Sequence, residues 1–246
     1  MIDDPIPQEP LQETPRPQWK LWVAAGGCFI LLCGAAFIGS LIIAGPKFVQ
    51  LFVPEKIQVA EDSPRDVTQK NTMGDPNAPV YIIEYGDFQC PYCLKFWTES
   101  EQQLIEEYVN TDKVYFEYRS FPILGTESNW AAEGAYCAGD QGKFWEYHDT
   151  LFTNWIGENV GDFTKDKLIK YAKALDLNMD EFEACINQEK YKGAVEQDKA
   201  AGEASGVTAT PTFFINGVKI EGAQPYSILR QFIEQALDGI LEIQSG

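Results

Sequence analysis

The chain has 246 residues, of which 37 are acidic and 19 basic, so its formal net charge at pH 7 is −18. Most of the acid lies beyond residue 45, because residues 1–45 contribute a net charge of only −2. Phosphate is bound by basic surfaces, so this composition argues against nucleic acid as a partner and against adsorption to anionic lipid. The length fits one domain of about two hundred residues behind an N-terminal segment.

Residues 1–20 contain five prolines and four acidic residues and predict a disordered tail. Residues 21–45 are an uncharged apolar run, which as a helix of about 37 Å would span a bilayer. Trp19 and Trp22 suit a membrane interface. A cleaved signal peptide is the alternative, but its apolar part is usually only about 7–15 residues long. We therefore expect an uncleaved transmembrane anchor with a cytoplasmic tail.

Basic residues flank both ends of this apolar run, so charge alone does not set its orientation. Downstream of the run the chain holds four cysteines, and an even number suits an oxidising compartment. We therefore expect the C-terminal domain on the extracytoplasmic side of the cell membrane.

Residues 46–78 contain four prolines and mixed charge, and we expect a linker there. Residues 79–85 predict a buried strand, which leads through a short turn into a helix that continues to about residue 110. Residues 113–121 alternate between apolar and polar and predict a second strand. A crossover of helical length makes these two strands parallel.

A long helical block is predicted for residues 124–205, and it contains a capping box at Asn178 and Glu181. Strand signals return at residues 212–215 and 218–220, joined by the hairpin turn Asn216-Gly217. A last helix begins near Pro225, and its predicted apolar face extends to Ile240. The element order predicts an α/β fold in which a helical insertion divides the strands.

The chemistry of the chain is expected at Cys90-Pro91-Tyr92-Cys93. Pro91 suits the first position of a helix, which places Cys90 at the helix N-terminus. Free N–H groups and the helix dipole stabilise a thiolate there, and a thiolate is the nucleophile in disulfide exchange. An inert disulfide and half of a zinc site are the alternatives. Zinc would need two more ligands, and the chain has one histidine and no second Cys-x-x-Cys, so we expect no metal.

The strand, the Cys-Pro-Tyr-Cys helix and the downstream run Thr210-Pro211-Thr212-Phe213-Phe214-Ile215-Asn216-Gly217 together resemble the thioredoxin superfamily. The helical block between the two halves resembles the DsbA-like thiol-disulfide oxidoreductases of that superfamily. The resemblance covers residues 79–246. It implies a thioredoxin-like fold with a helical insertion at about 124–205, here preceded by one transmembrane helix, and it implies electron exchange with unfolded secreted proteins. We expect no cofactor.

The resemblance assigns roles by position. Cys90 attacks in the reduced form or is attacked in the oxidised form, and Cys93 resolves the mixed disulfide. Thr210 and Pro211 match the family's cis-proline loop, which lies against the active-site disulfide. The backbone of Thr210 is then expected to pair with an extended substrate segment, as an added strand does.

Glu84 matches the position of a buried acid that, in this family, is thought to relay protons to the resolving cysteine. The alternative is a strand residue that faces outward. Pro91 and Tyr92 form the dipeptide between the sulfurs, which tunes the reduction potential. Other members carry a histidine there that stabilises the thiolate by charge. Tyr92 lacks this charge, which argues against a very strongly oxidising potential.

Cys137 and Cys185 each lie on the apolar face of a predicted helix. Some relatives carry a structural disulfide in this block, which implies that these two residues pair, and two separate buried thiols are the alternative. His148 shares a stripe with Phe144 and Phe152, so we expect it to pack in the core rather than to act as a base.

These observations predict a membrane-anchored, extracytoplasmic thiol-disulfide oxidoreductase that oxidises the cysteines of secreted or membrane proteins. A quinone-linked membrane enzyme would then reoxidise the Cys90–Cys93 pair. The first alternative is a disulfide reductase or isomerase on the same scaffold, kept reduced by a membrane donor. The second, from another class, is a tethered binding or chaperone module whose disulfide is inert.

Overall fold

The computed structural model describes residues 57–58 and 70–241. The predicted tail at 1–20 and the predicted span at 21–45 lie outside these residues. In the part of the chain that the structure describes, every helix is too short or too polar to cross a membrane.

A five-stranded sheet forms the centre of the domain, with the strand order β1-β3-β2-β4-β5. Its strands are β1 (Thr72–Met73), β2 (Val80–Gly86), β3 (Val114–Ser120), β4 (Thr212–Ile215) and β5 (Val218–Glu221). Strands β2 and β3 run parallel, and every other neighbouring pair is antiparallel. Both the parallel pair and the hairpin predicted from the sequence are confirmed. The hairpin turns at Asn216 and Gly217, whose φ angles are 45° and 86°.

The helix after β2 is continuous through residue 109, but two of its turns are π-helical. It consists of α1 (Pro91–Phe96), η1 (Trp97–Glu101), α2 (Gln102–Leu104) and η2 (Ile105–Val109). The insertion follows β3 and is helical, as predicted. Its helices are α3 (Thr126–Gly139), α4 (Phe144–Asn154), α5 (Lys165–Ala174), α6 (Met179–Asn187) and α7 (Lys192–Ala204). The last helix is α8 (Tyr226–Leu237).

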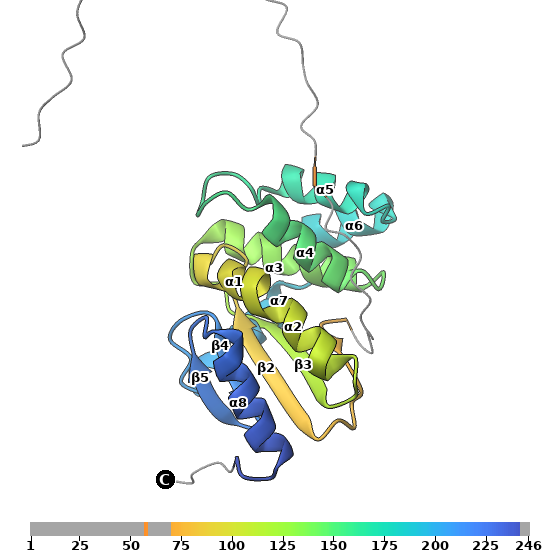
Figure 1. Ribbon diagram of the computed structural model, residues 1–246. Coiled ribbons are helices and arrows are strands. Elements are labelled where there is room, and N and C mark those ends of the chain that lie inside the picture. Colours follow the sequence, from red (N-terminus) through yellow and green to blue (C-terminus); the bar gives the residue numbers. More distant parts are fainter. Residues whose placement is uncertain (1–56, 59–69, 242–246) are drawn as a thin grey trace, which may run out of the picture. The chain divides into compact units, whose positions relative to one another are not determined.

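Alternating side chains give the sheet two buried faces. On one face Phe213 of β4 packs edge-on against Phe96 of α1, with ring centroids 4.6 Å apart. On the other face Tyr85 and Phe121 form a smaller cluster, where Gly202 of α7 leaves room for both rings. Figure 1 shows α1, α2 and α8 over the same face of the sheet. The chain thus forms the predicted α/β fold with a helical insertion.

The folded domain begins earlier than residue 79. Thr72 and Met73 form β1 on β3, and the Thr72 carbonyl accepts a hydrogen bond of 3.1 Å from the Trp145 indole. Further upstream, the backbone of Gln58 makes two hydrogen bonds with the Asn154 side chain. The described C-terminal part of the predicted linker 46–78 therefore belongs to the domain. A two-residue strand is too short to show the alternation that would predict it.

The prediction for the last helix is correct for its middle and wrong for its end. Leu229 and Ile233 are buried, whereas Ile228 is partly exposed. Ile240 is 69% exposed because α8 ends at Leu237, so Ile240 lies outside its apolar face. The predicted capping box at Asn178 is present, with the N–H of Glu181 donating to the Asn178 side chain.

Candidate active site

Cys90 occupies the N-cap position of α1, with extended backbone angles of −78° and 122°, and Pro91 begins the helix. The Cys90 carbonyl accepts the first helical hydrogen bond, from the N–H of Leu94 at 3.0 Å. Both Cys90 and Cys93 carry free thiols and are buried. The turn after β2 therefore delivers the first sulfur to the N-terminal end of a helix, where partial positive charge concentrates.

The surroundings of Cys90 favour its thiolate. A hydrogen bond from the Cys93 thiol lowers the pKa of Cys90 from 9.0 to about 6, although burial acts in the opposite direction. The Thr210 hydroxyl and the backbone N–H groups of Cys93 and Tyr92 add to the lowering. At pH 7 the reduced site thus holds mainly a Cys90 thiolate, which is the nucleophilic form.

Cys93 has the opposite character. Complete burial raises its pKa well above 9.0, and the neighbouring Cys90 and Glu84 raise it further. A Cys93 thiolate is therefore unstable, and this sulfur requires a proton whenever a disulfide to it is broken. The two sulfurs therefore have different roles. Cys90 is the stable nucleophile, and Cys93 is its protonated partner.

Thr210 and Pro211 lie directly against the reactive sulfur. Their peptide bond is cis. The Cys90 thiol donates to the Thr210 carbonyl oxygen, with 3.3 Å between Sγ and that oxygen. The buried Thr210 hydroxyl has no hydrogen-bond partner of its own among the described residues, so it can serve the thiolate. Sequence reasoning assigned Thr210 a backbone role and missed this side-chain donor.

Glu84 lies on β2, opposite Tyr118 of β3 and Phe213 of β4, and its side chain is 2% exposed. The alternative prediction of an outward-facing residue is therefore wrong. Burial raises the pKa of Glu84 well above 4.5, and the charges of Glu101 and Cys90 raise it further. Burial therefore favours the protonated carboxyl group, which is the form that can donate a proton.

A second buried polar cluster lies next to this acid. Candidate ligand atoms of Glu101, His148 and Asp149 all lie within 4.8 Å of one another. His148 Nδ1 is 3.0 Å from Asp149 Oδ1, and the Trp97 indole donates to the same oxygen at 2.9 Å. An imidazole and two carboxylates could hold a divalent cation or share protons. His148 also packs edge-on against Phe88, as its predicted core position requires.

Sequence reasoning missed Glu101 and Asp149. The signal for Glu101 was its spacing, since it follows Trp97 by four residues and precedes Leu104 by three. Such a position lies on the apolar face of a helix. An acidic residue there is costly unless it is paired or protonated, which marks it as a candidate functional residue.

Asp87 fixes the turn that precedes Cys90. Its carboxylate accepts hydrogen bonds from the backbone N–H groups of Gln89 at 2.9 Å, Ile123 at 2.8 Å and Leu124 at 3.1 Å. The loop after β3 is thereby attached to the active-site turn. Asp87 was not predicted, because its carboxylate acts on backbone groups that lie 36 and 37 residues away.

Gln89 attaches the same turn to the helical insertion. Its amide nitrogen donates to the Ser128 hydroxyl at 2.9 Å, and its amide oxygen accepts from the N–H of Asn159 at 2.6 Å. Asn159 belongs to the loop between α4 and α5. The residue directly before Cys90 is thus held by two segments of the insertion.

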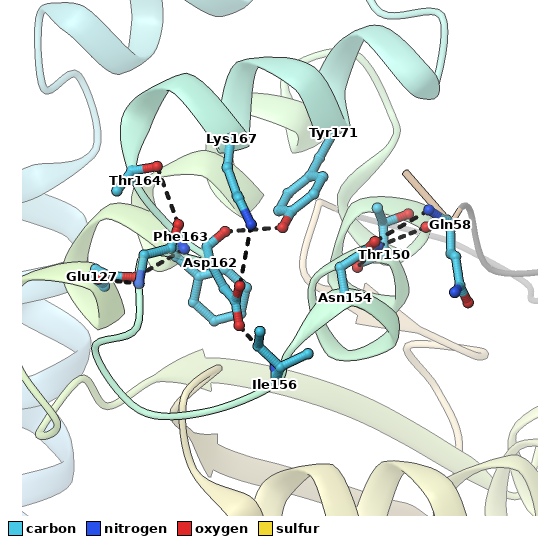
Figure 2. Close-up of polar contacts among 11 residues, drawn as sticks. Gln58, Glu127, Thr150, Asn154, Ile156, Asp162, Phe163, Thr164, Lys167 and Tyr171 are labelled. Atoms are coloured by element: carbon cyan, nitrogen blue, oxygen red, sulfur yellow. Dashed lines mark hydrogen bonds and ion pairs between the residues drawn. The ribbon is translucent and has the colours of Figure 1, made fainter. Parts of the chain in front are cut away.

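The loop between α4 and α5 is built around two carboxylates (Figure 2). Asp162 accepts from the N–H of Ile156 at 2.8 Å. Glu127 of α3 accepts from the N–H groups of Gly161 at 3.0 Å and Phe163 at 2.9 Å. These hydrogen bonds hold the backbone of the loop in place, although several of its side chains remain exposed.

Cys137 and Cys185 form a disulfide that joins α3 to α6. The structure therefore places the two residues as a pair, and the alternative of two separate thiols does not hold. Both belong to the insertion, apart from the Cys90 turn, which fits a structural cross-link.

Comparison with known proteins shows which family the chain belongs to. A family model described as thioredoxin matches residues 66–235. The chain is 35% identical over 167 residues to the Na(+)/H(+) antiporter NhaA 3 of Salinispora tropica, a match that covers 67% of the chain and 24% of that protein. The chain therefore spans about a quarter of the length of the curated antiporters that it matches.

Two further relatives match most of their own length. The chain is 27% identical over 152 residues to the probable disulfide bond formation protein D of Bacillus cereus, covering 60% of the chain and 70% of that protein. The crystal structure of Wolbachia pipientis alpha-DsbA1 superimposes with a TM-score of 0.61 and 27% identity, covering 69% of the chain and 92% of that structure. The chain belongs to the thioredoxin superfamily, among its DsbA-like members.

Proposed function

We propose that this chain oxidises cysteine pairs of secreted or membrane proteins through a Cys90–Cys93 disulfide. The observation that carries the proposal is the contrast between the two sulfurs, with the pKa of Cys90 lowered to about 6 and that of Cys93 raised by burial. A stable Cys90 thiolate stabilises the reduced site. The disulfide form is then the better oxidant, because its reduction yields that stabilised thiolate.

The reaction proceeds by two exchanges. A substrate thiolate attacks Cys90 Sγ, the Cys90–Cys93 bond breaks, and Cys93 leaves as a thiolate that takes up a proton. A second substrate thiolate then attacks the substrate sulfur of the mixed disulfide, and Cys90 leaves as a stable thiolate. The substrate loses two electrons and gains a disulfide, while the enzyme pair is reduced.

Other residues of the site support these steps. Glu84 supplies the proton to Cys93, since both groups are fully buried, the charge of Glu84 acts on the Cys93 thiol, and the raised pKa of Glu84 favours its protonated form. Thr210 stabilises the Cys90 thiolate through its hydroxyl, and its backbone pairs with an extended substrate segment beside Pro211. Tyr92 is 63% exposed and lies where the substrate must approach.

The location and redox partner are also part of this proposal. The apolar run at 21–45 would anchor the chain in the cell membrane, with the catalytic domain on the extracytoplasmic side. A quinone-linked membrane enzyme would accept the electrons from the reduced pair. The uncharged run and the four downstream cysteines in the sequence support this arrangement.

A redox titration of the full chain against glutathione tests the direction. Mass mapping follows the Cys90–Cys93 pair separately from the other cysteines. A potential near roughly −120 mV would support an oxidase, whereas one near roughly −270 mV would favour the reductase alternative. If Cys90→Ser retained full activity in dithiol oxidation, the disulfide would be inert and the proposal would fail.

A further inference from the structure

A groove lies between α3 and α7, and neither active-site sulfur lines it. One wall carries Thr126, Trp130 and Glu133 of α3, which share a face of that helix because they are four and three residues apart. The other wall carries Val195 and Glu196 of α7. The groove has a volume of about 450 Å³, which is large enough to hold a small organic ligand.

Glu133 and Val195 form the bottom of the groove. Their side chains are buried, at 4% and 2% exposure, whereas Thr126 and Glu196 are exposed. Glu133 Oε2 has no hydrogen-bond partner among the described residues. A buried carboxylate without a partner is costly, and burial accordingly raises the pKa of Glu133, with a further contribution from the charge of Glu189. A ligand that brings a positive charge to this carboxylate would offset that cost.

The charged groups around Glu133 have one net negative charge when Glu133 is ionised. Glu189 contacts two lysines, with Lys192 Nζ at 3.1 Å and Lys165 Nζ at 3.8 Å. Glu196 acts on Glu133 with the same sign as Glu189, and the two lysines act against them. Three carboxylates and two ammonium groups leave a charge of −1, so a ligand with one positive charge would balance the group.

The spacing of the carboxylates and the position of Trp130 indicate the kind of cation. Within residues 57–58 and 70–241, the one group of three acidic, histidine or cysteine side chains close enough to hold a metal ion lies elsewhere, around His148. The three carboxylates of the groove are therefore too far apart to chelate one metal ion. Trp130 offers an indole face, and the Lys165 ammonium lies 6.0 Å from its ring centroid. An ammonium group on an alkyl chain suits this groove, because the alkyl chain can pack against the indole and Val195.

We propose that the groove between α3 and α7 binds a primary ammonium group carried on an alkyl chain, as in the side chain of a lysine. The ammonium group pairs with Glu133 at the bottom of the groove, and the alkyl chain packs against Trp130 and Val195. The binding does not depend on thiol-disulfide exchange at Cys90. A free alkylamine and a lysine of a partner polypeptide share this chemistry, and the experiment separates the two sources.

Fluorine NMR of the full chain labelled with 5-fluorotryptophan measures binding at Trp130, whose signal is assigned with Trp130→Phe. The probes are pentylamine, a capped alanine-lysine-alanine tripeptide, and the same tripeptide with an acetylated lysine side chain. The first two should shift the Trp130 signal saturably, whereas the acetylated tripeptide lacks the positive charge and should not. A lower dissociation constant for the lysine tripeptide indicates a polypeptide ligand, and a lower one for pentylamine indicates a free amine.

Glu133→Gln keeps the shape of the protonated acid and should weaken the binding of both amines about tenfold. Glu196→Gln changes an exposed side chain, so it leaves the core intact and should weaken binding about threefold. Glu183→Gln is the matched control, because it removes one exposed negative charge on α6 outside the groove and should leave the dissociation constants unchanged.

Three results would overturn the proposal. The first is an equal shift of the Trp130 signal by the acetylated and the unmodified tripeptide. The second is wild-type affinity for the amines in both Glu133→Gln and Glu196→Gln. The third is a shift of the same signal by calcium chloride at lower concentrations than either amine requires, because the groove would then be a metal site.

Discussion

Replacement of Cys93 by alanine should raise the pKa of Cys90. The hydrogen bond from the Cys93 thiol is the main cause of the lowering to about 6. At pH 7 a thiol of this pKa is about ten parts thiolate to one part thiol, whereas a thiol with the reference pKa of 9.0 is about 1% ionised. The difference stabilises the reduced pair by about 1.4 kcal/mol, or about 30 mV for a two-electron couple. In Cys93→Ala the Thr210 hydroxyl remains, so the pKa should rise but stay below 9.0.

The thiolate absorbance at 240 nm, followed from pH 3 to pH 10, measures this pKa directly. Cys93→Ser is the matched control, because its hydroxyl can still donate to the Cys90 thiolate and should give a smaller rise. Each variant is compared with a second protein that also carries Cys90→Ser, which removes the signal of the other thiols. A wild-type midpoint near 8.5, or an unchanged midpoint in Cys93→Ala, would refute the reasoning.

The same pKa sets the pH dependence of the reduction potential. Because the pKa of Cys90 is lowered, the stabilisation of its thiolate is fully present above 9.0 and is lost as the pH falls through about 6. Reduction takes up two protons below pH 6 and one proton above it. The potential should therefore fall by about 59 mV per pH unit below this point and by about 30 mV per unit above it. A single slope across pH 5 to 8 would contradict the assignment.

Three other changes have defined outcomes. Glu84→Gln keeps the shape of the neutral acid but cannot release its proton, so stopped-flow reduction by a dithiol should slow about 100-fold while stability changes little. Replacing both Cys137 and Cys185 by alanine removes a cross-link over 48 residues and should cost about 4 kcal/mol in urea unfolding, with the pKa of Cys90 unchanged. Gly202→Ala places a Cβ atom 2.7 Å from the Phe121 ring and should destabilise the domain by about 1–3 kcal/mol.

A specific result would contradict each of these three predictions. Wild-type kinetics in Glu84→Gln would remove the proton-donor role. A shifted pKa of Cys90 in the double cysteine variant would show that the disulfide acts on the catalytic site. Gly193→Ala is the control for Gly202, since its Cβ meets open space on the same helix and should be neutral or stabilising. Equal effects of the two glycine changes would exclude steric overlap as the cause.

Local sequence patterns correctly predicted the elements around the site, although they extended the last helix too far. The apolar run before Cys90 predicted β2, Pro91 predicted the helix start, and Asn216-Gly217 predicted the hairpin. The parallel pairing of β2 and β3 followed from the length of the connection between them. The Cys137–Cys185 pairing depended on resemblance, because spacing alone does not show which helix faces bring two sulfurs together.

The parts that were not predicted depend on contacts between distant segments. In the sequence, Asp87 looks like an ordinary turn residue. Its structural role depends on the hydrogen bond that it accepts from Ile123 in the folded chain. In the sequence, Asp149 looks like an ordinary polar residue of α4. It is buried in the folded chain, where it accepts a hydrogen bond from Trp97. β1 is stable because β3 provides its hydrogen-bond partners, not because its two residues favour a strand.

These contacts between distant segments give the helical insertion a direct part in the chemistry of the site. Ser128 and Asn159 of the insertion hold Gln89, which precedes Cys90, while Asp149 of α4 binds the Trp97 indole in the helix that follows Cys93. The active-site helix is thus held by the insertion on both sides of the Cys-Pro-Tyr-Cys motif. The lowered pKa of Cys90 requires its sulfur to lie within hydrogen-bond reach of Thr210 and the first turn of α1. A domain without the insertion would keep these residues but lose the supports that position them, so the insertion is part of the redox site.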